Sequence, residues 1–388
     1  MSHKPTSEET ISSDQSTRRR HFLQAAGSAG LLGVVGLAGC SGTGNGNGSG
    51  NGNGNGNGND NGNGNGGSGG TDLTQWSITG SQEGSPANAW VQGFAAVMDE
   101  HSETLRLEPK PYSDWLGALA LTSEGTEDLV TSWAHNCFQA QNDIKKFAEG
   151  GDVGPVDPKP MMTIPVIHQG LWWVGTHADR DDIETVGDLD GMDVATQLPG
   201  AAPSTWFESC LNEAGAEPNQ LSFMPFPEAA SAMQSRNIDA SLFLAINGAI
   251  VPAPTQQAFQ AVDVKGVEIP EDVLQSVKDN DWQTMQWKSV RNENFNVQAA
   301  PLEDFEQTTA FQMVSSNYIR STADADLVYE YVKTILENQD SLGEYHAALN
   351  ATGIGERRHN FEGIPEGIQF HEGAIRYYDE EGIDYPGN

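Results

Sequence analysis

The chain has 388 residues and carries 54 Asp and Glu against only 20 Lys and Arg, a formal net charge of −34. This balance disfavours binding to nucleic acid, because the phosphate backbone attracts Lys and Arg and repels carboxylates. Such an acidic surface is tolerated in concentrated salt, where the Debye length falls to ~3 Å at 1 M and self-repulsion is screened. We therefore expect a halophilic source.

Residues 1–39 have the pattern of an export signal. Paired arginines, Arg19 and Arg20, precede the uncharged small and apolar run 25–39. This order is typical of a secretory signal, and the arginine pair indicates twin-arginine export. The run is shorter than the ~20 apolar residues of a membrane span. The sequence Leu-Ala-Gly-Cys that ends at Cys40 resembles a lipoprotein box, which predicts a lipid anchor on Cys40. The alternative is a chance Cys beside an ordinary cleavage site.

Residues 40–71 are predicted to be a disordered tether behind that anchor. Residues 41–70 are almost wholly Gly and Asn, so they have no side chains with which to build a core. A flexible coil of ~30 residues has a reach of roughly 30 Å. The rest of the chain exceeds the size at which one core usually stops growing, which predicts two domains. It contains no further apolar run long enough to span a membrane.

Strand and helix patterns alternate after the tether. Strands are expected at 73–79, 105–110, 126–133 and 164–175, and helices at 88–100, 112–124 and 134–148. This alternation predicts βαβ units and a mostly parallel α/β sheet. Ligands of such sheets bind beyond the carboxyl ends of the strands, where the turns 80–86, 112–115 and 134–136 lie.

A second strand–loop–helix unit follows. It comprises a strand at 193–197, the loop 198–205 and a helix to about residue 214. Beyond it we expect a helix at 228–235, a strand at 241–246, a returning strand at 308–315 and an amphipathic helix at 325–338. Residues 252–300 are left without assigned elements. Backbone N–H groups at a helix N-terminus favour an anion, so loops of this kind are candidate ligand contacts.

The C-terminal sequence resembles the closing signature of the TAXI family, the extracytoplasmic solute receptors of TRAP transporters. The matching residues are His371, Gly373, Ala374, Tyr377, Tyr378, Glu380 and Gly382, with Glu372 in place of the usual Pro. The resemblance extends over most of residues 75–382 and includes Thr79-Gly80, the turn 188–191, Pro199-Gly200 and the segment 238–240. The family loop Pro-Gly-Ser-Gly-Thr is replaced here by the longer loop 199–205, which lacks the second Gly.

The resemblance implies a two-lobe, periplasmic-binding-protein-like fold of type II with a ligand cleft between the lobes. Lobe one would comprise residues 72–178 plus 306–388, and lobe two residues 179–305. The function implied is capture of a small organic solute, a carboxylate or an amino-acid-like molecule, and its delivery to a TRAP-type membrane permease. The protein would then sit outside the cytoplasm, held by lipid to the outer face of the cell membrane.

The candidate ligand-binding residues lie in the loops at the predicted strand ends. They are Gly80, Ser81, Gln82, Gly84, Ser85, Asn88, Tyr112, Trp133, Asn136, Pro199, Gly200, Ser204, Thr205 and Asn247. These loops contain no Arg. An anion would therefore rest on helix N-termini, hydroxyl groups and the amides of Asn88, Asn136 and Asn247.

No catalytic, cofactor or metal motif is present. The sequence lacks His-Glu-x-x-His, Gly-x-Ser-x-Gly, a Walker loop and Cys-x-x-Cys. We expect His371 to have a structural role and Trp172 and Trp173 to be core residues. Cys137 and Cys210 are expected to be buried thiols. A surface-anchored enzyme of bilobal architecture and a ligand sensor for a membrane signalling protein remain the alternatives to a transport receptor.

Overall fold

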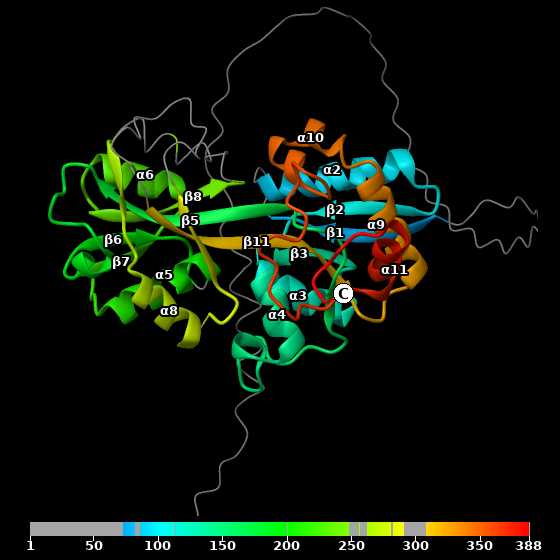
Figure 1. Ribbon diagram of the computed structural model, residues 1–388, viewed down its shortest axis with the longest axis horizontal. Helices are drawn as coiled ribbons and strands as arrows, with labels where there is room; N and C mark the ends of the chain where they lie inside the picture. The colour runs from blue at the N-terminus through cyan, green and yellow to red at the C-terminus, as the bar shows by residue number, and fades with distance from the viewer. Residues whose placement is uncertain are drawn as a thin grey trace, which may run out of the picture. The chain divides into compact units, whose positions relative to one another are not determined.

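The computed structural model describes residues 73–81, 86–112, 114–199, 201–247, 256, 262–280, 282–290 and 308–387 (Figure 1). These residues belong to one compact unit that begins at Ser68. The predicted signal, the tether and Cys40 lie outside the described residues. Within those ranges, no helix is long and apolar enough to cross a membrane.

The described strands form one continuous mixed sheet. They are β1 (Thr74–Thr79), β2 (Leu105–Lys110), β3 (Leu129–Trp133), β4 (Pro160–Met162), β5 (His168–His177), β6 (Asp193–Thr196), β7 (Gln220–Phe223), β8 (Ala240–Ile246), β9 (Val264–Val267), β10 (Gln286–Val290) and β11 (Thr308–Arg320). The order across the sheet is β2-β1-β3-β11-β5-β8-β6-β7; in addition, β4 and β10 pair with β11 and β9 pairs with β5. The prediction of a mostly parallel sheet is wrong, because the pairings that involve the long strands β5 and β11 are antiparallel.

Helices pack around this sheet. They are α2 (Pro86–His101), α3 (Trp115–Glu124), α4 (Ala134–Asn142), α5 (Ala202–Ala214), α6 (Phe226–Gln234), α8 (Glu271–Asn280), α9 (Ala325–Glu337), α10 (Leu342–Tyr345) and α11 (Glu372–Glu381). Asp114 caps α3 and Asp324 caps α9 through side-chain oxygens that accept backbone N–H groups. His371 caps α11, since its Nδ1 accepts the Gly373 N–H at 3.2 Å, which confirms the structural role predicted for it.

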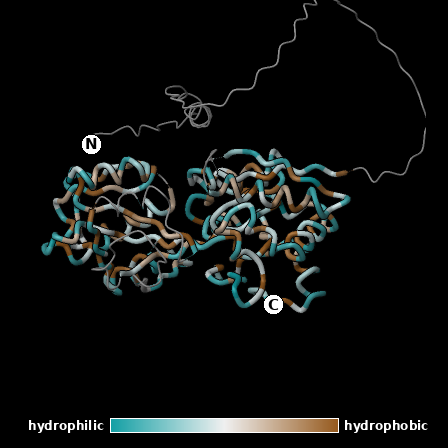
Figure 2. The backbone as a smooth tube through the Cα atoms, turned by 90° about the horizontal axis from the view of Figure 1, so that it is seen from above, coloured by the Kyte–Doolittle hydropathy of each residue, from teal (hydrophilic) through white to brown (hydrophobic). Residues whose placement is uncertain are grey.

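Three core clusters divide these elements into two lobes. The first cluster contains Phe94 and Tyr318 and lies among β1–β4, α2–α4 and α9–α11, which we name the first lobe. The other two lie in the second lobe, which comprises β6–β10, α5, α6 and α8: one contains Trp206 and Leu242, and the other contains Met233 of α6 and Phe243. Apolar segments recur inside both lobes in Figure 2. The long strands β5 and β11 run through both lobes (Figure 1). This is the predicted two-lobe, periplasmic-binding-protein-like α/β fold.

Strand directions decide which ends of the two lobes meet. Strands β1, β2 and β3 are parallel, and β3 is antiparallel to β11. Strand β5 is antiparallel to both β11 and β8, while β6 and β7 run parallel to β8. The carboxyl ends of β1–β3 therefore point toward the second lobe, and those of β6–β8 point toward the first.

The element boundaries differ from the sequence prediction mainly at the strands shared between lobes. Strand β11 has 13 residues and continues to Arg320, whereas the prediction ended it at Ser315. Polar residues follow that point, but the first two, Ser316 and Asn317, are buried and bonded: Ser316 donates to the Ile164 carbonyl at 2.7 Å. A strand was predicted at 164–175, but residues 164–167 form a loop and β5 begins only at His168. Strands β4 and β7 were not predicted.

The two thiols are buried and free, as predicted. Cys137 lies in α4 of the first lobe and Cys210 in α5 of the second. Burial raises the pKa of both thiols, so neither forms a thiolate readily.

A buried polar contact joins β11 to its neighbours in the first lobe. The Asn317 amide donates to Thr131 Oγ1 at 2.9 Å on β3, and its oxygen accepts the Tyr331 hydroxyl at 2.8 Å on α9. All three residues are at most 1% exposed. This contact satisfies an amide that would otherwise be stranded inside the core.

Replacing Tyr331 by Phe should destabilise the protein by about 1–3 kcal/mol, because the Asn317 oxygen would be left without its donor. Tyr329→Phe is the matched control: its hydroxyl bonds to Glu380 at 2.6 Å at an exposed site, so a change within about 0.5 kcal/mol is expected. Denaturant unfolding of the full chain measures both. Equal effects of the two substitutions would contradict this account.

Candidate ligand-binding cleft

The facing strand ends place several helix N-termini between the lobes. Helix α3 is capped by its own Asp114, which accepts from Leu116 N at 3.1 Å and Gly117 N at 3.0 Å. Helices α4 and α5 have no side-chain cap within the described residues. Helix α4 begins directly after β3, so Trp133 is both the last strand residue and the N-cap. No described side chain therefore accepts the first N–H groups of α4 and α5, the kind of donor that suits an anion.

An aromatic cluster lies at the ends of β3 and β5. We define it as Trp90, Trp115, Trp133 and His168. Ring centroids are 4.2 Å apart for Trp90 and His168, 4.7 Å for Trp115 and Trp133, and 5.1 Å for Trp133 and His168. Trp115 and Trp133 are only half-buried, so part of each ring faces solvent.

Hydrogen bonds fix the orientation of these rings. Trp115 Nε1 donates to the Gly80 carbonyl at 2.8 Å, and His168 Nδ1 lies 2.5 Å from Ser315 Oγ. Trp90 Nε1 donates to His346 Nδ1 at 3.2 Å. Three of the four rings, those of Trp90, Trp115 and His168, are therefore held by a group on a different segment, as a preorganised binding surface requires.

The aromatic cluster carries no charge at neutral pH. Burial lowers the pKa of His168 well below its usual value, and the nearby His359 and His346 lower it further. His346 also has a lowered pKa through burial, and its Nδ1 accepts both Trp90 Nε1 and the Ala348 N–H. A ligand would therefore meet aromatic surface here rather than a cation.

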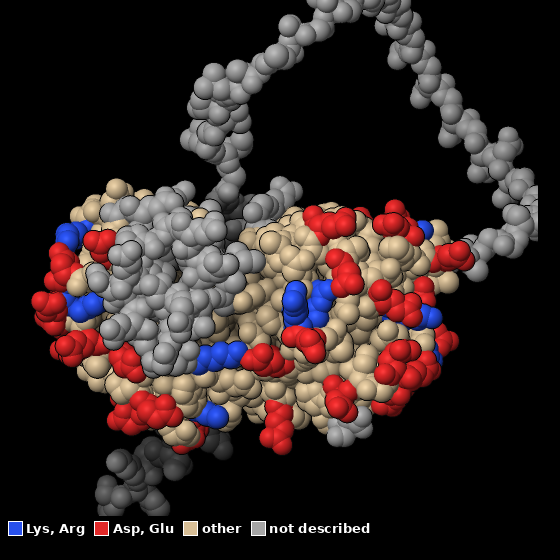
Figure 3. Space-filling view, turned by 45° about the horizontal axis from the view of Figure 1, so that its top comes forward, with Lys and Arg blue, Asp and Glu red and all other residues tan. Residues whose placement is uncertain are grey.

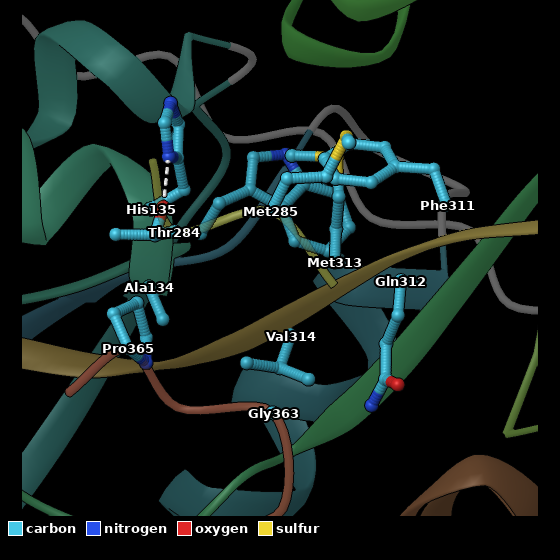
Figure 4. A pocket seen from close by; sticks show the side chains of 11 residues that line it. Ala134, His135, Thr284, Met285, Phe311, Gln312, Met313, Val314, Gly363 and Pro365 are labelled. Atoms are coloured by element: carbon cyan, nitrogen blue, oxygen red, sulfur yellow. Dashed lines mark hydrogen bonds between the residues drawn. The ribbon is translucent and has the colours of Figure 1, made fainter. Parts of the chain in front are cut away.

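A small cavity lies where the two lobes meet along β11 (Figure 4). One edge of β11 pairs with β10 through residues 308–312 and with β3 through residues 315–318. The cavity occupies the gap between these two pairings. It is lined by Trp133, Ala134, His135, Gly363 and Pro365 from the first lobe side, by Thr284 and Met285 from the second, and by residues 311–314 of β11.

His135 joins the lobes beside this cavity. Its ring stacks on Trp282 with centroids 4.3 Å apart and planes 20° apart. Its Nε2 lies 2.6 Å from Gln139 Nε2, which can only donate, so Nδ1 carries the proton toward Thr284 Oγ1 at 2.6 Å (Figure 4). Burial, reinforced by the charges of Lys145 and Lys146, lowers the pKa of His135 to about 3.

The residues predicted from the first lobe gather near the aromatic cluster. Gly80 binds Trp115 through its carbonyl, and the Ser81 carbonyl lies 3.5 Å from the Asn88 amide nitrogen. Tyr112 precedes α3, and burial, followed by nearby carboxylates, raises its pKa. Asn136 is buried, and its amide nitrogen lies 3.4 Å from Ser132 Oγ.

The residues predicted from the second lobe have local partners. Ser204 is buried with its Oγ 3.2 Å from Thr196 Oγ1, and Thr205 Oγ1 donates to the Ala201 carbonyl at 3.2 Å. Pro199 is exposed in the loop before α5. Asn247 accepts from Gln169 N at 2.9 Å. Gln82, Gly84, Ser85 and Gly200 lie outside the described residues.

Asn247 also connects the lobes. Its amide nitrogen donates to the Ala348 carbonyl at 2.8 Å, so the end of β8 is tied to the first lobe. Its φ of 57° lies in the left-handed region, which Asn tolerates better than most residues.

Three residues at the meeting of the lobes were missed as site candidates: Trp115, His135 and His168. His168 stands at the start of an otherwise apolar strand, and an imidazole in that position is a detectable signal. Trp115 and His135 lie in the turns 112–115 and 134–136, which were predicted to be near the ligand, but the contacts that single them out come from distant segments.

Residues 169–382 match the NMT1-like family, and this match covers more than half of the sequence, so the chain belongs to the NMT1-like family. No curated protein matches the chain. A TctC solute-binding protein from Polaromonas is similar at 12% identity, covering 80% of this chain and 96% of that one, with a TM-score of 0.44. An ancestral arginine-binding protein bound to arginine is 12% identical, covering 70% and 96%, with a TM-score of 0.40.

A third similar structure is a TRAP periplasmic solute-binding protein from Sulfitobacter with bound β-D-galacturonate. It is 11% identical, covering 79% of this chain and 94% of that one, with a TM-score of 0.38. At these low scores, the three likenesses carry no conclusion about the ligand or the transporter of this chain.

We expect His135 to make the protein less stable in acid. Imidazole has an ordinary pKa of about 6.5, so the unfolded chain binds this proton more tightly than the folded chain does. The contribution is complete above pH 6.5 and declines as the pH falls toward 3. Part of the ring edge remains accessible, so a loss of about 1–2 kcal/mol by pH 5 is expected.

The test compares the wild-type chain with His135→Gln, which has no titrating group, by denaturant unfolding from pH 8 to pH 5. The variant should lose less stability over this range, and the difference at pH 8 supplies the baseline. Parallel curves at all pH values would show that His135 does not contribute to the acid sensitivity.

Proposed function

We propose that the protein is an extracytoplasmic solute receptor, which captures a small organic solute between its lobes and releases it unchanged to a TRAP-type membrane permease. The observation that carries this proposal is the opposition of the carboxyl strand ends of the two lobes across β5 and β11. Ligands of open α/β sheets bind beyond such ends. Closure of two lobes about a few shared strands is a common mode of ligand capture.

The proposed ligand is a small carboxylate or an amino-acid-like molecule. The N-termini of α4 and α5 have no side-chain cap in the described chain, and each N-terminus carries a partial positive charge. They approach from different lobes, so one anionic group or two could join the lobes on closure. The candidate loops contain no Arg, which leaves helix N-termini and amides as the available donors.

Anchoring and partner choice complete the proposal. Lipid on Cys40 and the tether 40–71 would hold the receptor at the outer face of the membrane, within reach of the permease. The two lobes would comprise residues 72–178 plus 306–388 and residues 179–305. The acidic surface suits operation in concentrated salt.

A thermal-shift screen of the full chain in molar salt tests this function. The panel contains glutamate, 2-oxoglutarate and C4 dicarboxylates, each with an uncharged amide analogue as its matched control, together with neutral sugars. A ligand at ~100 times its Kd should add roughly 2.7 kcal/mol to stability, a shift of several degrees. The amide analogues should shift the melting temperature far less.

Mass spectrometry of the recovered ligand separates receptor from enzyme. An unchanged ligand supports the receptor, whereas a converted ligand would indicate an enzyme of bilobal architecture. No shift with any carboxylate would overturn the proposed ligand class.

A further inference from the structure

Apolar side chains line the facing edges of both lobes. On the first lobe these are the half-buried rings of Trp115 and Trp133. On the second lobe, Leu198 follows β6 and Phe223 ends β7, and their exposed fractions are 57% and 40%. Both are unusual, since few large apolar residues in the described chain are so exposed. Opposed apolar surfaces on the binding edges indicate a ligand with an apolar body.

The aromatic surface continues across β5 into the second lobe. Trp172, on β5, stacks on Phe226 at the start of α6, with centroids 6.0 Å apart and planes 15° apart. Gly170 lies between this pair and Trp133. A β-carbon on Gly170 would stand 3.0 Å from Trp172 Nε1 and 3.4 Å from Trp133 Cη2. Glycine at this strand position therefore allows the aromatic groups of the two lobes to approach each other.

Trp172 contributes a hydrogen-bond donor without a partner. The residue is 6% exposed, and its Nε1 makes no hydrogen bond to the described residues. The indole N–H can only donate, and a buried donor is normally satisfied. Its position over Gly170, beside Trp133, suits an acceptor atom on a ligand held between the lobes.

We propose that the solute is a carboxylate with a planar unsaturated ring. This inference rests on the proposed receptor function. The ring stacks on the open faces of Trp115 and Trp133 and packs against the apolar edge of the second lobe. The carboxylate lies at the N-terminus of α4, which begins at Ala134 next to the Trp133 ring. Separation of the lobes exposes Trp172 Nε1–H to an acceptor atom of the solute.

The first experiment measures binding of matched acids to the full chain in molar salt by titration calorimetry. The pairs are benzoate with cyclohexanecarboxylate and phenylacetate with cyclohexylacetate, and glutarate and phenyltrimethylammonium are added as further probes. At least one aromatic acid should bind about tenfold more tightly than its saturated partner, which corresponds to ~1.4 kcal/mol.

If both aromatic acids bind no more tightly than their saturated partners, the proposal that the solute contains a planar ring is wrong. If glutarate binds while the ring acids do not, the carboxylate receptor stands and only this inference fails. If none of the acids binds, both proposals fail. Tight binding of phenyltrimethylammonium alone would indicate that the tryptophans bind a cation, and the proposal that the solute is a carboxylate would then be wrong.

Two variants test the position of the ring. Gly170→Ala places a methyl group against Trp172 and Trp133, and Trp172→Phe keeps an aromatic ring, smaller than indole, but removes the donor. Each should weaken binding of the preferred aromatic acid by about tenfold. Gly187→Ala is the control for the first, since a β-carbon there meets nothing nearer than 3.5 Å.

Trp173→Phe is the control for the second variant, because Trp173 points to the opposite face of β5 and stacks on Phe243. Melting temperatures of all four variants separate a lost contact from a lost fold. Variants at positions 170 and 172 that melt like their controls and bind like wild type would contradict the assignment of this site.

Discussion

The structure depends on two long antiparallel strands that are shared by both lobes. Strands β5 and β11 run in opposite directions through the middle of the sheet, and their neighbours β8 and β3 each pair antiparallel to them. The carboxyl ends of the two lobes must then face one another. This arrangement buries polar backbone and side-chain groups deep inside the protein, where they need hydrogen-bond partners. The β11 segment 315–317 shows how such partners are provided. Its hydroxyls and amide are bonded to β3, α9 and the loop before β5.

Contacts between the lobes combine apolar stacking with a few hydrogen bonds. His135 stacks on Trp282, Asn247 reaches the Ala348 carbonyl, and Lys288 on β10 forms an ion pair with Glu362. Burial opposes ionisation of Glu362, but the hydrogen bond and charge of Lys288 lower its pKa on balance. The pKa values of His135 and His168 are also lowered, in their case by burial, and a lowered pKa keeps a histidine neutral. The two histidines therefore add no charge where the lobes meet, and Lys288 and Glu362 balance each other there, in a protein whose surface is strongly acidic.

That contrast bears on how an acidic protein could bind an acid. On the described part of the face shown in Figure 3, acidic side chains are scattered, mostly toward the rim, and they outnumber the basic ones. At low ionic strength, this field would repel an anionic solute, while in molar salt it acts over only ~3 Å. The groups that we propose to stabilise the negative charge of the solute are dipoles: the N-termini of α4 and α5, which have no described side-chain cap, and an indole N–H. Dipoles act at short range, so they stabilise a ligand only after other contacts have positioned it. In our proposal, aromatic side chains on both lobes position the ligand.

Four features could be predicted from the sequence alone: the alternation of strands and helices, the amphipathic helix predicted at 325–338, the burial of both thiols and the α/β class. Each follows from local periodicity or from chemistry within a few residues. The sequence could not determine the length of β11, because Ser316 and the amide nitrogen of Asn317 bond to partners more than a hundred residues away, the Ile164 carbonyl and Thr131. Nor could it place Trp115, Trp133, His168 and Trp172 together, since each belongs to a different local element or strand position. Only the pairing of distant strands brings these rings together where the lobes meet. The close approach of Trp172 and Trp133 to Gly170 exists only in that tertiary arrangement.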